Sequence, residues 1–467
     1  MKAGDTEGTN KVSQGSIIDR EDTNTIITNQ ETDTASSNTV TIDAGNDKVE
    51  VTLDNVNIKA GSGSALTSKG DVTLTLKGDN HLTGGISDTG NYGRNGIAST
   101  GSLTITGGEN GSLTAQGGSG ADGGHGGHGI YSNGSLTISG GSTVTANGGN
   151  GGNVSGDGIC SNGGVTISGG STVTANGGNG GSLGGGSGIY SNGSVTISGG
   201  TVNANGGDGQ DGYGGDGIRS SSGGVTISGG TVTANGGNST NSSGGYGISS
   251  LDVAISSGTV TANGGDSKDG YGGDGIHSND IDLSGSLELT AKAGKGTQSN
   301  GKALSQNGRE LDLNAIKDKL GPGAKVTATD ADGKVIDQVS IPRPVEPEGP
   351  VIPEESSSSS DGGSAAPSAP AFSLPGLTVT DKDGQRISYT STQSGNTLTV
   401  CVGRFTASFR ISLAALRPLR AEGIETITFQ TILCSTTLSV DELLAMGGED
   451  AEAVLTHRST DSSLTVG

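Results

Sequence analysis

Acidic and amide side chains recur at fixed positions in the glycine-rich middle of the chain. They lie ten and seven residues before the isoleucines of three successive Gly-Ile pairs, Ile218, Ile248 and Ile276. They also lie two residues before Ile218 and Ile276, whereas Tyr246 has that position before Ile248. If these segments stack in register, their oxygens lie about 4.8 Å apart. Calcium binds oxygen at about 2.3–2.6 Å, so one ion could bridge neighbouring segments. We predict calcium ligands at Asp208, Asp211, Asp216, Asn238, Asn241, Asp266, Asp269 and Asp274; the alternative is that these residues only keep a glycine loop soluble.

Aromatic rings and hydrogen-bond donors form a second pattern around the same isoleucines. They stand five residues before the isoleucine, as at Tyr213, and one residue after it, as at Tyr131. Such rings can stack on sugar faces while their polar groups bind hydroxyls. The predicted polysaccharide-binding residues are Tyr92, Tyr131, Tyr190, Tyr213, Arg219, Tyr246, Tyr271 and His277. The alternative is that the rings cover a small area of apolar wall.

Other chemistry has less support in the sequence. The chain lacks P-loop and HExxH motifs, and Arg219 is the one basic candidate for a lyase near the acidic loops, so we expect no enzyme. Rows of Thr-x-Thr, as at Thr143 and Thr145, resemble ice-binding solenoids, a minor alternative. Threonine is also simply a favourable strand residue.

A repeat of about 29 residues must position these side chains. The Gly-Ile isoleucine recurs with steps of 33, 29, 30, 29, 30 and 28 residues, at Ile97, Ile130, Ile159, Ile189, Ile218, Ile248 and Ile276. Three short β-prone runs per repeat are typical of one solenoid coil. Alternation places Val144 and Ala146 on an inward face. Asparagines follow the first and third runs and suit a stacked corner. The sequence predicts an all-β fold, a right-handed parallel β-helix.

Composition changes divide the chain into four parts. Residues 1–38 are predicted to be a disordered or weakly strand-like lead-in, and 39–341 the capped β-helix. Residues 342–375, rich in Pro, Ser and Glu, are predicted to be a linker. Residues 376–467 are predicted to be a small β-rich domain with a short helix after Ser439. Cys401 and Cys434 in that domain could pair, whereas Cys160 is expected to be a lone tolerated thiol.

Charge and composition limit the classes of molecule that the protein is expected to bind. The 467 residues include 91 glycines and no tryptophan, and the formal charge is −22. This charge disfavours nucleic acid and anionic membranes. No apolar run is long enough to span a bilayer. We expect a secreted or cell-surface protein whose export signal was removed or lies outside this chain.

The first coils carry a family resemblance. The segments V51-T-L-D-N-V-N-I58, A65-L and V72-T-L-T-L-K-G-D-N-H-L-T83 resemble the start of bacterial carbohydrate-binding β-helix proteins, whose clostridial member binds polygalacturonate. The resemblance covers roughly residues 39–340 and implies an extracellular, calcium-containing right-handed β-helix, related in shape to pectate lyases. The leading hypothesis is therefore a calcium-dependent polysaccharide-binding protein. The alternative is a structural adhesin stalk whose C-terminal domain makes the contacts, and the oligomeric state stays open.

Overall fold

The computed structural model describes residues 1–342 and 376–466, with short gaps at 6–8, 15, 30–32, 88–90, 109, 122, 382–384, 388, 395, 403–405, 422, 432–434, 449–450 and 458–461. Two compact units divide the chain, Met1–Glu346 and Pro347–Gly467. The predicted linker lies outside the described residues except for Pro342.

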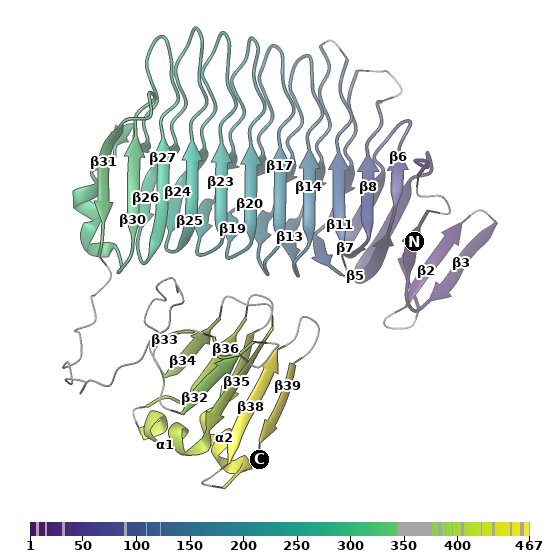
Figure 1. Cartoon of the computed structure of the whole chain (residues 1–467). Helices are drawn as coiled ribbons and strands as arrows, with labels where there is room; N and C mark the ends of the chain where they lie inside the picture. Colours follow the sequence, from purple (N-terminus) through teal and green to yellow (C-terminus); the bar gives the residue numbers. More distant parts are fainter. Residues whose placement is uncertain are drawn as a thin grey trace, which may run out of the picture. The chain divides into compact units, whose positions relative to one another are not determined.

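The first unit is a parallel β-solenoid of about 12 turns with about 29 residues per turn, which confirms the predicted fold class. One turn consists of β12 (Ile130–Ser132), β13 (Ser135–Ser139) and β14 (Thr143–Asn147), followed by a glycine-rich loop. Figure 1 shows the strands stacked side by side with the loops projecting beyond one end of them. Each strand pairs in parallel with its copy in the next turn, as in Ile130↔Ile159 and Val144↔Val173.

The strands form three rows. The first row comprises β9 (Ile97–Ser99), β12, β15 (Ile159–Ser161), β18 (Ile189–Ser191), β21 (Ile218–Ser220) and β28 (Leu304–Gln306), and the second β10 (Leu103–Gly107), β13, β16 (Gly164–Ile167), β19 (Val195–Ile197) and β22 (Gly224–Ile227). Four longer strands span both rows: β5 (Val40–Asp54), β7 (Leu66–Lys77), β24 (Ile248–Ile255) and β26 (Ile276–Leu283). The third row comprises β6 (Asn57–Lys59), β8 (Asp79–Thr83), β11 (Ser112–Gln116), β14, β17 (Thr172–Asn176), β20 (Thr201–Asn205), β23 (Thr231–Asn235), β25 (Gly258–Asn263), β27 (Leu287–Lys292) and β30 (Lys325–Thr329).

Aliphatic rows fill the interior between the strands. All seven Gly-Ile isoleucines are fully buried, and Val144 and Ala146 are at most 1% exposed, as predicted from the alternation. Asparagines at the corners bond to their stacked copies. Asn176 Nδ2 donates to Asn147 Oδ1 at 2.8 Å, and the same 2.8 Å bond continues through Asn205, Asn235 and Asn263. The predicted asparagine ladder after the third strand is therefore present.

The glycine loops are held by their backbone rather than by side chains. Their two arms alternate along the stack: Gly186 N donates to Gly178 O, Gly207 N to Gly186 O, and Gly215 N to Gly207 O, at 2.8–2.9 Å. The approach leaves no room for a side chain, since a Cβ on Gly215 would lie 1.9 Å from Gly186 O. Glycine is required here because two backbones touch.

Both ends of the solenoid are covered. At the C-terminal end, β29 (Arg309–Glu310) and β31 (Val335–Ser340) pair antiparallel with β28 and β30, and the 3-10 helix η1 (Leu313–Lys319) buries Leu313 and Ile316. Antiparallel additions end a parallel stack and protect its edge.

At the N-terminal end, the described part of the lead-in at 1–38 is strand-like rather than disordered, which is the second of the two predicted alternatives. It includes β1 (Lys2–Ala3), β2 (Asn10–Gln14), β3 (Ile17–Asp22) and β4 (Ile26–Thr28). Strand β4 continues the stack by pairing in parallel with β5. Buried Asn10 anchors the segment, because its Nδ2 donates to Thr25 Oγ1 and to Glu50 O. Polarity does not imply disorder here, because these polar groups are satisfied inside the fold.

The second unit contains two four-stranded sheets and two helices. One sheet has the order β32 (Leu377–Thr380), β35 (Ala407–Ser412), β38 (Glu452–His457), β39 (Ser462–Val466); the other has the order β33 (Thr390–Ser394), β34 (Thr397–Cys401), β36 (Thr426–Gln430), β37 (Ser435–Ser439). Helix α1 spans Leu413–Ala421, and α2 spans Val440–Met446, capped by Ser439 as predicted. Phe409 and Phe429 form its centre, with ring centroids 4.9 Å apart. Cys401 is a free thiol, and Cys434 lies outside the described residues.

Candidate functional site

A band of polar and aromatic side chains follows the line where each glycine loop enters the first strand row. We call it the strand-entry strip. It consists of the residues two before and one after the Gly-Ile isoleucine in six successive turns: His128/Tyr131, Asp157/Cys160, Ser187/Tyr190, Asp216/Arg219, Tyr246/Ser249 and Asp274/His277. The second members are in register from strand to strand, Tyr131↔Cys160↔Tyr190↔Arg219↔Ser249↔His277. Five of the eight predicted sugar-binding residues therefore lie on one strip.

The three acidic first members of the strip accept hydrogen bonds from the backbone of the next turn. Asp157 Oδ1 accepts from Ser187 N at 2.7 Å, and Asp216 Oδ1 accepts from Tyr246 N at 2.8 Å. Asp274 Oδ1 accepts from Lys302 N in the same way, at 2.7 Å. Asn95 Oδ1 and His128 Nδ1 accept from His128 N and Asp157 N in the same way, so a side-chain acceptor at this position supports stacking.

The second oxygen of each of these carboxylates faces a basic side chain. Asp274 Oδ2 lies 2.7 Å from His277 Nδ1, and Asp216 Oδ2 lies 3.6 Å from Arg219 Nη1. Burial raises the pKa of Asp216 to about 6, although the N–H of Tyr246 and the charge of Arg219 act in the opposite direction. The strip therefore holds buried negative charge beneath partly exposed bases and rings.

Ring contacts order the outer surface of the strip. Tyr246 and His277 stack with centroids 4.4 Å apart and an interplanar angle of 10°. Tyr190 donates its hydroxyl to Asn192 Oδ1 at 2.7 Å, and Tyr131 accepts from Asn162 Nδ2 at 3.0 Å. These rings are half-buried, so one face or edge of each is fixed while the remainder meets solvent. Fixed rings bind a flat ligand without a large entropy loss.

The other three predicted sugar-binding residues lie on the glycine loops, apart from the strip. Tyr92, Tyr213 and Tyr271 are 49%, 64% and 54% exposed. Tyr92 contacts His125 of the next turn, with centroids 5.3 Å apart. Tyr213 and Tyr271 are separated by two turns, about 9.6 Å at the usual strand spacing. They form a sparser second set than the strip.

The predicted calcium ligands do not converge on an ion. Asp208 Oδ1 accepts from Asn238 N, and Asn238 Oδ1 accepts from Asp266 N, at 2.7 and 2.9 Å. Asn241 Nδ2 donates to Asp211 Oδ1 at 2.7 Å. The carboxylates of each column are separated by an asparagine or tyrosine turn, while calcium needs six to eight oxygens at one point. These residues do not fit calcium; their contacts show a structural ladder.

A different cluster of metal-ligating side chains was missed in the sequence. Within the described residues, His128, Asp157 and Cys160 form the one group of three or more His, Cys, Asp or Glu residues whose ligand atoms all lie within 4.8 Å of one another. The signal was available, because His128 and Asp157 occupy the same position as Asp216, two residues before the isoleucine. The same count in these earlier turns places them next to Cys160, which the sequence predicts to be a lone thiol.

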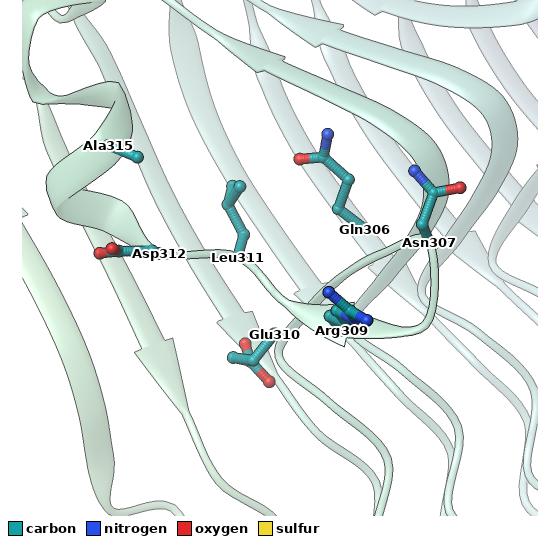
Figure 2. Close-up of a pocket in the computed structure, with 7 residues that line it drawn as sticks. All are labelled: Gln306, Asn307, Arg309, Glu310, Leu311, Asp312 and Ala315. Carbon is teal, nitrogen blue, oxygen red and sulfur yellow. The ribbon is translucent and has the colours of Figure 1, made fainter.

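A shallow depression near the C-terminal end of the solenoid is a weaker candidate for a binding site than the strip (Figure 2). Its lining residues are Gln306, Asn307, Arg309, Glu310, Leu311, Asp312 and Ala315. Glu310 accepts from the backbone of Leu304 and Ala303, and Asp312 caps η1. Its acidic groups therefore complete the cap.

Comparisons with known proteins identify no relative of this chain. The chain matches no family model, and neither the curated proteins nor the solved structures compared with it give a significant match. The family resemblance of the first coils therefore stays a prediction. Among the described residues, the helices are all too short or too polar to cross a bilayer.

Proposed function

We propose that the protein is an extracellular binding protein for an extended polysaccharide, which lies along the strand-entry strip. The in-register alignment of ring and donor side chains over six turns carries this proposal. A polymer with a repeating unit fits a surface whose side chains repeat at about 4.8 Å. Tyrosine rings supply sugar-stacking faces, and Arg219 and His277 supply donors for hydroxyl oxygens.

Charge favours an uncharged glycan over polygalacturonate. The formal charge of the chain is −22, and the strip itself contains Asp157, Asp216 and Asp274. A polyanion would meet repulsion that the few bases of the strip do not offset. Calcium is not part of the proposal, because its predicted ligands do not fit the ion.

Binding of neutral and acidic polysaccharides to the full-length chain tests the proposal. We expect a neutral glycan to bind, and the double variant Tyr190→Ala/Tyr246→Ala to bind it at least about tenfold more weakly. Tyr213→Ala/Tyr271→Ala is the matched control, since it removes two loop tyrosines from outside the strip. Full affinity in the strip variant would contradict the proposal and favour a stalk whose second unit makes the contacts.

A further inference from the structure

The acidic turns of the strip differ in how their buried carboxylate is neutralised. Asp216 and Asp274 each have a base three residues later in the same turn, Arg219 and His277. The turn of Asp157 has Cys160 at that position instead. Asp157 Oδ2 faces a base only from the preceding turn, His128, whose Nδ1 lies 3.3 Å away. This turn alone among the three combines a carboxylate, an imidazole and a thiol.

The three side chains converge from two neighbouring turns. Their ligand atoms lie within 4.8 Å of one another. Cys160 is a free cysteine and only 6% exposed, while the side chains of Asp157 and His128 are 15% and 28% exposed. Ligand atoms around a tetrahedral zinc ion are about 3.5 Å apart. Side-chain rotations that move the three ligand atoms by about 1 Å would therefore complete the geometry. The cluster is thus nearly preformed, with its exposed side at His128.

The surroundings of His128 favour positive charge. The Asp157 carboxylate lies 3.3 Å from its Nδ1, and the thiol of Cys160, an anion once deprotonated, is the third member of the cluster. A divalent cation responds to the same negative groups more strongly than a proton does. Its binding would release the thiol proton, because the ligand is the thiolate.

We propose that His128, Asp157 and Cys160 bind one divalent transition-metal ion, with zinc the best match. Thiolate, imidazole and carboxylate together suit a borderline-soft ion, whereas calcium and magnesium prefer oxygen alone. Three protein ligands leave a fourth position open to solvent or to a bound ligand. The proposal does not depend on glycan binding.

Metal binding has one local cost. His128 Nδ1 accepts a hydrogen bond from Asp157 N at 2.9 Å, and coordination through the imidazole gives up this bond. The neighbouring bonds of the same column, such as that from Ser187 N to Asp157 Oδ1, can persist because the ion needs only the second oxygen. The stack of turns is therefore retained around the ion.

Titration with Co²⁺ of the full-length chain, metal-free, reduced and without a histidine tag, tests the proposal. We expect one ion per chain, a thiolate-to-cobalt charge-transfer absorption, and displacement by Zn²⁺. Cys160→Tyr and His128→Asn should each lose the absorption and bind the ion at least about 100-fold more weakly. Both variants place a residue that the same column already accommodates, because Tyr131 and Tyr190 flank Cys160 in register and Asn95 Oδ1 accepts from His128 N.

The control Cys401→Ser/Cys434→Ser removes the remaining cysteines and should leave the titration unchanged. Circular dichroism verifies that each variant is folded. The proposal is overturned if the wild-type chain shows no charge-transfer absorption, or if the absorption survives Cys160→Tyr.

Discussion

Each turn of the solenoid contains a strand region and a loop region, which share one repeat but are held to the neighbouring turns by different interactions. The strand region stacks through fully buried aliphatic rows, such as that of Ile159, Ile189 and Ile218. The loop region stacks through backbone hydrogen bonds between glycines, with almost no apolar side chain. The stability of the strand stack depends on removing apolar surface from water. The stability of the loop stack depends on the contact distance between two main chains.

This difference predicts opposite tolerances. A strand position accepts another aliphatic residue of similar volume, because the free energy gained by burying a side chain is roughly proportional to the apolar area that it removes from water. A loop glycine at a backbone contact accepts no side chain, however small. Many of the 91 glycines are thus packing residues, although such a composition is usual for flexible segments.

Ile189→Asp is expected to have the largest effect. It places an unpaired carboxylate in a dry row and should destabilise the solenoid by about 3–5 kcal/mol. Urea unfolding of the full chain, with hydrogen exchange of the adjacent turns, measures the loss. Thr201→Asp introduces the same charge at an exposed strand position and is the control. An unchanged unfolding midpoint for Ile189→Asp would contradict the role given to the aliphatic rows.

Gly215→Ala tests the loop region. Its Cβ would lie 1.9 Å from Gly186 O, so the two arms must separate and lose hydrogen bonds. We expect a destabilisation of about 3 kcal/mol and faster exchange of the loop amides. Gly199→Ala is the matched control: a Cβ there meets no atom within 4 Å, and its effect should stay within about 0.5 kcal/mol. Equal effects of the two variants would show that the loop is not held by backbone contact.

The strand region could be predicted from the sequence because its physics is local and periodic. Ile130 and Val144 identify the rows, and Asn147 identifies a corner that only stacking can satisfy. The hydrogen-bonded ladder of Asp208 and Asn238 in the loops could not be predicted from the sequence. Their side-chain oxygens can either bind a calcium ion or accept a hydrogen bond from a backbone N–H. The His128 cluster depends on contacts between turns of different length, so only the position of each residue relative to its isoleucine predicts that the three side chains meet.

Asp216 lies at the boundary of the two regions, where the loop becomes strand, and its ionisation should report on both. It is 6% exposed, and burial raises its pKa from 3.8 to about 6. A raised pKa means that the folded state binds the proton more tightly than the unfolded state. Its contribution to stability is therefore complete below about pH 4 and is lost as the pH rises through about 6.

Asp216→Asn should remove this loss while keeping an oxygen that accepts from Tyr246 N. Relative to wild type, the variant should gain about 2 kcal/mol of unfolding free energy between pH 4 and pH 7, measured by urea unfolding at each pH. Asp208→Asn makes the same change at an exposed ladder position and is the control. Because Arg219 remains in the variant, its loss of a partner at 3.6 Å reduces the gain only slightly. Parallel pH profiles for Asp216→Asn and wild type would mean that water reaches this carboxylate, and that the loop separates from the strand region at the boundary.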